Sequence, residues 1–272
     1  MLYFCLFLHK QAHMDIYETP LKAERQNRIR KIIEKQGRVT VPELSVQFDV
    51  SEATIRRDLE ELDVRGWIQR THGGAIHIER ASREPPMIQR ITEQYLEKQH
   101  IGQAAAKFVQ DGETIFLGSG TTVLEVARHL SPELQLTVIT NSLPVVNELA
   151  DRPNIELIVI GGMLRQSEFS MVGHITEQAV REFRADIVFM GMRAIDVRHG
   201  FTNDYLPETM TDRAILSIAP RIIVVADHRK FGRVSSVLVG PVTSAHVIIT
   251  DQLTSSEYVL ELTEIGVEVI QV

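Results

Sequence analysis

Residues 50–62 read VSEATIRRDLEEL and have the pattern of a capped, amphipathic helix. Ser51 is of a residue type that favours the N-cap, where its hydroxyl accepts a hydrogen bond from the first turn. Ile55, Leu59 and Leu62 follow one another at i, i+4 and i+7, so they share one face of the helix. We expect this face to be buried and the opposite face to be exposed.

The flanking residues complete the pattern of three helices followed by a two-stranded wing. Residues 24–37 place isoleucines on one helical face, and Gly37 is a typical helix terminator. The stretch VTVPELSVQF begins a second helix, because Pro42 is tolerated in a first helical turn. After the capped helix, WIQRTHGGAIHI at 67–78 predicts two short strands around a Gly-Gly turn.

The start of the capped helix is a candidate DNA-reading surface. A recognition helix presents its N-terminal residues to base edges in the major groove. Arginine can bridge guanine O6 and N7, and a threonine methyl group suits thymine. The alternative is a solvated helix whose arginines pair with Asp58, Glu60 and Glu61. The candidate DNA-binding residues are Ser51, Glu52, Ala53, Thr54, Arg56, Arg57, Arg70 and His72, the last two for phosphates or the minor groove.

Charge divides the 272-residue chain into two parts. Residues 22–80 contain 12 Lys and Arg and 10 Asp and Glu, which gives this part a formal charge of +2. Because the whole chain has a net charge of −7, the remaining residues carry −7 − 2 = −9. We predict an extension at 1–21 that is disordered and a winged helix-turn-helix domain at 22–80. Residues 81–90, which contain two prolines, are the predicted linker, and 91–272 form the second domain.

The composition is that of a soluble globular protein, 44% hydrophobic and 24% charged. No stretch approaches the roughly 18 apolar residues that a membrane helix needs, and MLYFCLFLHKQAHM is a poor signal peptide. Cys5 is the single cysteine, so no intramolecular disulfide is possible and a reducing, cytoplasmic location is expected. Translation starting at Met14 is favoured over Met1.

The second domain alternates short β-branched runs with helical patterns. Buried strands of a largely parallel sheet, with helices on both faces, are typical of such an α/β pattern. The strand-like runs are ETIFLG, LTVIT, IELIVIGG, DIVFMG, RIIVVAD and HVIITD, and the first is preceded by a helical pattern at 88–109.

A phosphate site is predicted where these strands end. LGSGTT at 117–122 links a strand to a helix, and the free N–H groups and dipole of a helix N-terminus favour an anion. The loops that follow other strands should reach the same edge of the sheet. Each has an ordinary alternative: Asn141 a helix cap, Gly161 a turn, Lys230 a solvated side chain. The candidates are Ser119, Gly120, Thr121, Thr122, Asn141, Ser142, Gly161, Gly191, Asp227 and Lys230.

VSEATIRRDLEEL followed by RTHGGA resembles the DeoR family of bacterial sugar-metabolism regulators, and the likeness extends from about Ala23 to the last residue. The resemblance implies a helix-turn-helix at about 39–58 with Thr54, Arg56 and Arg57 at the DNA. It also implies a C-terminal domain that resembles ribose-phosphate isomerases and senses phosphorylated sugars. In that resemblance Lys230 neutralises the ligand phosphate beside the 119–122 loop.

Three functions stay open: a sugar-phosphate-responsive repressor, an isomerase with an accessory DNA-binding module, and a DNA-binding protein whose second domain only oligomerises. The related isomerases need acid and base groups, yet Met190 and Arg193 stand where two acids would be and Asn203 near the place of a lysine. Asp212 is a lone carboxylate that could simply pair with Arg213. We therefore predict a regulator, not an enzyme, without cofactor or metal. As a dimer or tetramer, it would be released from operator DNA by a phosphorylated sugar.

Overall fold

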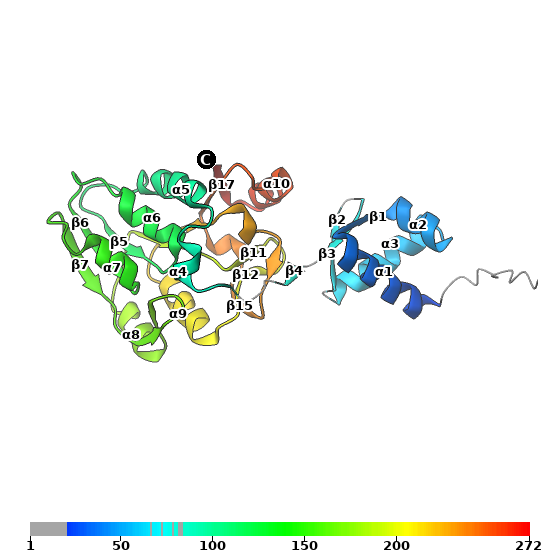
Figure 1. Ribbon diagram of the computed structural model, residues 1–272, viewed down its shortest axis with the longest axis horizontal. Coiled ribbons are helices and arrows are strands. Elements are labelled where there is room, and N and C mark those ends of the chain that lie inside the picture. Colours follow the sequence, from blue (N-terminus) through cyan, green and yellow to red (C-terminus); the bar gives the residue numbers. More distant parts are fainter. Residues whose placement is uncertain (1–20, 66, 72, 78, 81–83) are drawn as a thin grey trace, which may run out of the picture. The chain divides into compact units, whose positions relative to one another are not determined.

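The computed structural model describes residues 21–65, 67–71, 73–77, 79–80 and 84–272, and it divides after position 78 into two compact units (Figure 1). The predicted extension at 1–21 lies outside the described residues apart from Leu21. Among the described residues, no helix is both long and apolar enough to cross a membrane.

The N-terminal unit consists of three helices and a small antiparallel sheet, with strand order β1-β3-β2. The wing has the two predicted strands, and the third strand comes from the residues between the first two helices. The elements are α1 (Lys22–Gln36), β1 (Arg38–Thr40), α2 (Val41–Phe48), α3 (Glu52–Val64), β2 (Ile68–Thr71) and β3 (Gly74–His77).

Local signals fix the ends of these helices. Gly37 closes α1 with φ 76°, in the left-handed region that glycine tolerates. Thr40 and Glu43 form a reciprocal capping box at the start of α2, and the Ser51 hydroxyl accepts a hydrogen bond from Thr54 N at the start of α3. The predicted apolar face of α3 lies in the core of this unit, packed with side chains of the other two helices and the wing.

The C-terminal unit is built on a seven-stranded parallel sheet, so the predicted combination of a winged helix-turn-helix and a larger α/β domain is confirmed. The strand order is β17-β16-β13-β10-β5-β6-β7. The strands are β5 (Thr114–Leu117), β6 (Leu136–Thr140), β7 (Ile155–Val159), β10 (Ile187–Met190), β13 (Arg221–Val225), β16 (Val247–Thr250) and β17 (Glu268–Gln271).

Alternate residues of each strand enter two separate apolar cores, as the two-residue period of a strand requires. Ile187 and Phe189 pack under the helices of one face, whereas Val188 and Met190 pack under the helices of the other. The first face is covered by α5 (Tyr95–Ala106), α6 (Thr121–His129) and α7 (Leu143–Leu149). The second is covered by α8 (His174–Arg181), α9 (Leu206–Leu216) and α10 (Ser256–Glu264).

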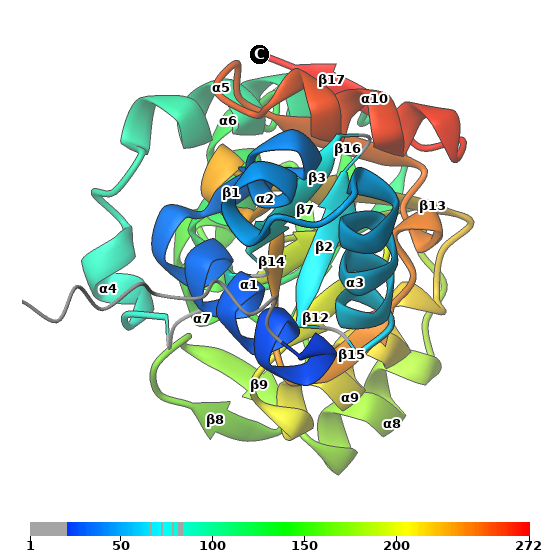
Figure 2. The same cartoon turned by 90° about the vertical axis from the view of Figure 1, so that its right-hand side faces the viewer.

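Shorter elements of the C-terminal unit lie outside the large sheet, and several of them are labelled in Figure 2. Three of them form an antiparallel sheet, two form a hairpin, and two pair in parallel. In that order they are β11 (Ala194–Asp196), β12 (Gly200–Asn203) and β15 (Val237–Gly240); β8 (Met163–Arg165) and β9 (Ser170–Val172); and β4 (Glu79–Arg80) and β14 (Arg233–Val234). Two 3-10 helices complete the unit, η1 (His228–Lys230) and η2 (Val242–Ser244).

The structure places the segment after the wing differently from the sequence prediction. Glu79 and Arg80, the last residues of the predicted winged domain, form β4 and belong to the C-terminal unit. The predicted linker ends in a short helix, α4 (Met87–Arg90), whose Met87 is buried. The helical pattern at 88–109 is divided between α4 and α5, because Gln94 adopts a left-handed conformation with φ 47°. Part of the predicted linker is therefore packed structure.

Candidate functional site

The N-terminal turn of α3 is an exposed surface on the N-terminal unit. Ala53, Arg56 and Arg57 are exposed, and Thr54 is half-buried with its hydroxyl 2.9 Å from Ser51 Oγ. Arg56 is bound by Glu52 at 2.9 Å, one helical turn away. No hydrogen bond or ion pair joins the Arg57 side chain to another described residue. Arg57 is thus an exposed candidate that forms no ion pair with another described residue.

Two acidic residues of α3, Asp58 and Glu61, are bound by side chains of α1 and not by the arginines of this surface. Asp58 is buried and accepts hydrogen bonds from Arg25 Nε at 2.6 Å and Gln26 Nε2 at 3.1 Å, both on α1. Glu61 likewise accepts bonds from Lys22 and Gln26. The alternative in which these carboxylates neutralise the arginines of α3 is therefore wrong for both, because they hold α1 against α3 instead.

Of the two candidate DNA-binding residues of the wing, the structure describes only Arg70. Arg70 lies on β2, half-buried, and its backbone N–H donates to Asp63 Oδ1 at 3.2 Å, so its peptide is tied to the end of α3. His72 lies outside the described residues.

In the C-terminal unit, β6 and β7 lie on one side of β5, whereas the later strands β10, β13, β16 and β17 lie on its other side. The order of the strands therefore reverses between β5 and β10. Ligands of open α/β sheets bind beyond the carboxyl ends of strands at such a switch point. The loops that follow these strands touch closely: a Cβ on Gly118 would lie 3.3 Å from Phe189 O, and one on Gly191 would lie 3.5 Å from Ser119 O. Gly120 has φ 117°, which favours glycine, and it caps α6.

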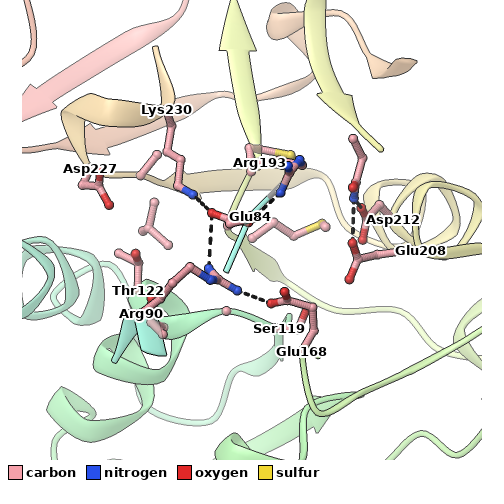
Figure 3. A pocket seen from close by; sticks show the side chains of 18 of the residues that line it. Glu84, Arg90, Ser119, Thr122, Glu168, Arg193, Glu208, Asp212, Asp227 and Lys230 are labelled. Atoms are coloured by element: carbon pink, nitrogen blue, oxygen red, sulfur yellow. Dashed lines mark hydrogen bonds and ion pairs between the residues drawn. The ribbon is translucent and has the colours of Figure 1, made fainter. Parts of the chain in front are cut away.

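A polar cavity of about 70 Å³ lies at this switch point (Figure 3). It brings together seven of the predicted residues: Ser119, Gly120, Thr121, Thr122, Gly191, Asp227 and Lys230. The remaining lining consists mainly of charged side chains from other elements, namely Glu84, Arg90, Lys98, Arg165, Glu168, Met190, Met192, Arg193, Asn203, Glu208, Asp212, Val225, Ala226 and Arg229.

Three predicted residues do not line this cavity, because they support neighbouring loops. Asn141 donates from Nδ2 to Met171 O at 2.8 Å, which ties it to β9 rather than to a helix cap. Ser142 forms an isolated bridge with Ser170. The carbonyl of Gly161 accepts a hydrogen bond from the Thr176 hydroxyl at 3.0 Å.

Basic side chains from three elements converge on the Glu84 carboxylate. Lys230 Nζ pairs with Glu84 Oε1, Arg90 Nη1 lies 3.4 Å from the same oxygen, and Arg193 Nη1 lies 3.2 Å from Oε2. Burial raises the pKa of Glu84, but these three cations outweigh it and hold that pKa below its usual range. Lys230 is therefore not the solvated side chain of the alternative reading.

Asp227 organises the loop that carries Lys230. It is fully buried, caps η1 by accepting a hydrogen bond from Arg229 N at 3.1 Å, and accepts another from Arg229 Nε at 3.0 Å. Burial raises the pKa of Asp227, whereas the Arg229 hydrogen bonds and the Lys230 charge together hold it below its usual value. Asp227 thus acts on the pocket through Arg229 and the conformation of η1.

A pair of carboxyl groups forms the opposite wall. Asn203 Nδ2 donates to Glu208 at 2.7 Å and to Asp212 at 3.4 Å, and Arg165 pairs with Glu208. Burial and the neighbouring Glu208 raise the pKa of Asp212 well above its ordinary value. Asp212 does not pair with Arg213, whose guanidinium donates to the carbonyls of β15.

Lys98, on α5, is one of the residues that line the cavity. Its Nζ donates to the carbonyls of Arg90 at 2.7 Å and Glu93 at 2.6 Å, so it holds the turn between α4 and α5. Burial lowers the pKa of Lys98 to about 8, with Asp227 opposing the shift.

Five residues missed by sequence reasoning reach the pocket from elements other than the ends of the central strands, whereas two others, Arg193 and Arg229, lie in the strand-end loops of the large sheet. Glu84 and Arg90 come from the segment before α5, Arg165 and Glu168 from the β8–β9 hairpin, and Glu208 from α9. A local signal existed for the first two, since they flank a proline pair that can begin a helix. The hairpin residues carry no comparable signal.

Comparisons with known proteins agree on both units. The DeoR-like helix-turn-helix domain matches residues 25–81, and the DeoR C-terminal sensor domain matches residues 93–252. Ribose 5-phosphate isomerase A of Methanocaldococcus jannaschii is similar at a TM-score of 0.37 and 20% identity, over 49% of this chain and 53% of that one.

Curated relatives cover nearly the whole chain. The HTH-type transcriptional regulator GolR of Listeria innocua is 33% identical over 84% of this chain and 90% of its own length. The glycerol-3-phosphate regulon repressor of Escherichia coli is 34% identical over 85% of this chain and 91% of its own. The transcriptional repressor AccR of Agrobacterium fabrum is 33% identical over 85% and 90%. With both domain models matched in order, this chain belongs to the DeoR family of transcriptional regulators.

Proposed function

We propose that the protein represses a sugar-catabolism operon by binding operator DNA through α3 and is released by a phosphorylated sugar bound at the switch-point cavity. The observation that carries the effector half is the cavity, in which Lys230, Arg90 and Arg193 converge beside the N-terminus of α6. Cations and free helix N–H groups together favour a phosphate group. The DNA-binding part of the proposal rests on α3 as the recognition helix.

The carboxyl pair of Glu208 and Asp212 suits a binding role. Their oxygens and the Asn203 amide form a polar wall opposite the cations, which could accept and donate hydrogen bonds to sugar hydroxyls. The isomerase alternative requires a set of acid and base groups, whereas Met190 and Arg193 stand where two of its acids would be. A sugar phosphate would therefore be held without being converted.

Coupling between the two sites requires that the effector favour a state with lower DNA affinity. We infer a dimer or tetramer, because two recognition helices on paired half-sites are the usual arrangement of helix-turn-helix regulators. By linkage, operator DNA must weaken effector binding by the factor by which the effector weakens DNA binding. A C-terminal unit that served only oligomerisation would show no such reciprocity.

Arg57→Ala should weaken binding to a specific duplex by about 1–3 kcal/mol, about 5- to 150-fold, if the guanidinium reads a base. Gel-shift titration would use a duplex that the wild-type protein selects from a random library, with a scrambled duplex as control. Arg57→Lys keeps the charge but loses the bidentate fork, so it should lose specific affinity while keeping affinity for the scrambled duplex. Equal affinity of wild type and Arg57→Ala for the selected duplex would exclude base reading by Arg57.

Lys230→Ala should abolish most of the thermal stabilisation that a phosphorylated sugar gives, because the phosphate loses a charged partner. A thermal-shift screen would compare glucose 6-phosphate, fructose 6-phosphate, ribose 5-phosphate and glycerol 3-phosphate with their unphosphorylated parents. Lys107→Ala, at an exposed position on the C-cap of α5, is the charge-matched control. If Lys230→Ala and Lys107→Ala respond alike to the best compound, the phosphate does not bind at Lys230.

A further inference from the structure

We propose that Glu84 is a built-in competitor of the effector: its carboxylate holds an anion position between Lys230, Arg90 and Arg193, and an effector phosphate displaces it and frees the segment that leads to the DNA-binding unit. This inference rests on the proposed function, since it describes how the same cavity is regulated. It adds that a side chain of the protein itself competes with the effector phosphate. It also adds how binding in the cavity could affect the segment that leads to the wing.

The first observation is the position of the Glu84 carboxylate. Its two oxygens are shared among three cations that come from α4, from the loop after β10 and from η1 (Figure 3). Among the residues that the structure describes, Glu84 is the only acidic partner of Lys230 Nζ. A planar carboxylate that accepts from several cations presents the same recognition chemistry as one face of a phosphate.

The second observation is that Glu84 divides the available space. It lines the cavity of about 70 Å³ that contains the 119–122 loop, and it also lines a second cavity of about 80 Å³. Arg90, Arg193 and Lys230 line both. Withdrawal of the Glu84 side chain would join the two spaces and leave the three cations facing one ligand.

The third observation is how the surrounding segment is held. Glu79 and Arg80 pair with Arg233 and Val234 of β14, a strand that begins three residues after Lys230. At the other end, Met87 N donates to Ser167 O at 2.8 Å and Arg90 pairs with Glu168. A two-residue strand has few hydrogen bonds, so the Glu84 ion pairs are the central anchor between these two attachments.

Release of this anchor changes the tether to the DNA-binding unit. While β4 is paired, position 78 alone separates His77 of β3 from Glu79 of β4. Once β4 is released, nine positions, 78–86, separate β3 from α4. Nine residues span about 30 Å when extended. A longer tether lowers the effective concentration of the second recognition helix at its half-site. Displacement of Glu84 therefore predicts weaker binding to a two-half-site operator and unchanged binding to one half-site.

The test compares Glu84→Gln, which keeps the shape and removes the charge, with wild type and Glu148→Gln. Glu148 is a matched control because its carboxylate binds Arg152 at 3.1 Å and lines neither cavity. Calorimetric titration with inorganic phosphate should give about tenfold tighter binding to Glu84→Gln than to wild type. Glu148→Gln should bind within about twofold of wild type, because the position between the three cations stays filled.

Hydrogen exchange of a peptide spanning 79–90 reports the release directly. Saturating phosphate should accelerate its exchange in wild type, and Glu84→Gln should exchange fast without phosphate. Unchanged phosphate affinity in Glu84→Gln, or a peptide that stays protected in phosphate-saturated wild type, would overturn the inference. If a sugar phosphate still releases DNA from wild type under either result, the proposed function stands and only the role of Glu84 fails. If no phosphorylated compound binds wild type or Glu84→Gln, both fail.

Discussion

Asp58→Ala should lower the free energy of unfolding of the N-terminal unit by about 3–5 kcal/mol, the usual cost of removing one member of a buried ion pair. Asp58 lies 2.6 Å from Arg25 Nε, and the two side chains are only 2% and 9% exposed. Its loss removes the carboxylate that faces a buried guanidinium and weakens the polar contacts between α1 and α3. We expect DNA binding to fall as the unit unfolds.

The single tryptophan makes this unit measurable inside the full chain. Trp67 lies at the start of the wing, with the Arg30 and Arg65 guanidinium groups over its ring at 5.2 and 5.5 Å. Urea titration followed by tryptophan fluorescence therefore reports unfolding of the N-terminal unit alone. Glu60→Ala, an exposed acid on the same helix, is the control and should change stability by less than about 0.5 kcal/mol. Equal shifts for the two variants would contradict a buried role for Asp58.

A second variant separates burial of the charge from packing. Replacing the pair together, Arg25→Met with Asp58→Leu, should recover most of the stability, because a buried ion pair exchanged for apolar side chains of similar volume is often neutral or stabilising.

Gly102→Val should destabilise the C-terminal unit by about 3 kcal/mol or more, at the upper end for overpacking. A Cβ at Gly102 would lie 2.6 Å from both the backbone carbon and the Cβ of Glu125, so α5 and α6 cross in contact there. The clash involves main chain and cannot be relieved by a rotamer change. Since α6 begins at the 119–122 loop, the variant should also weaken effector binding.

Thermal unfolding followed by circular dichroism would measure this effect. Gln103→Val places the same β-branched side chain at the next position of α5, where it is exposed. It therefore introduces the same β-branched side chain into the helix without the clash. If Gly102→Val and Gln103→Val unfold at the same temperature, α5 and α6 tolerate separation and the close crossing is not required.

The parts of the fold that the sequence predicted are those determined by neighbouring residues. The Ser51 cap, Gly37 as a terminator and the apolar spacing of α3 are all properties of a few consecutive positions. The central strands β10 and β13 were found because each is dominated by a continuous apolar run. β17, with the sequence EVIQ, was missed because charged and polar residues at its two ends interrupt that run.

The pocket was only partly predictable because its charged side chains form ion pairs with residues that are distant in the sequence. The strand-end rule located Ser119, Asp227 and Lys230, which follow the central strands. It equally selected Asn141 and Gly161, which support neighbouring loops, since the rule identifies an edge of the sheet and not the direction of a side chain. Arg90 and Glu168 meet across 78 residues of sequence. Single-sequence patterns hold no information on such pairs.

The order of strands in the large sheet has a consequence for synthesis of the protein. β5 pairs with β10, so the centre of this sheet cannot form until about 70 further residues have left the ribosome. The N-terminal unit is made first and depends on contacts within a much shorter stretch, which favours fast folding. A nascent chain should therefore hold a folded recognition helix before its sensor exists. The time that the ribosome takes to translate the C-terminal unit would then set how long the N-terminal unit could bind DNA without regulation by an effector.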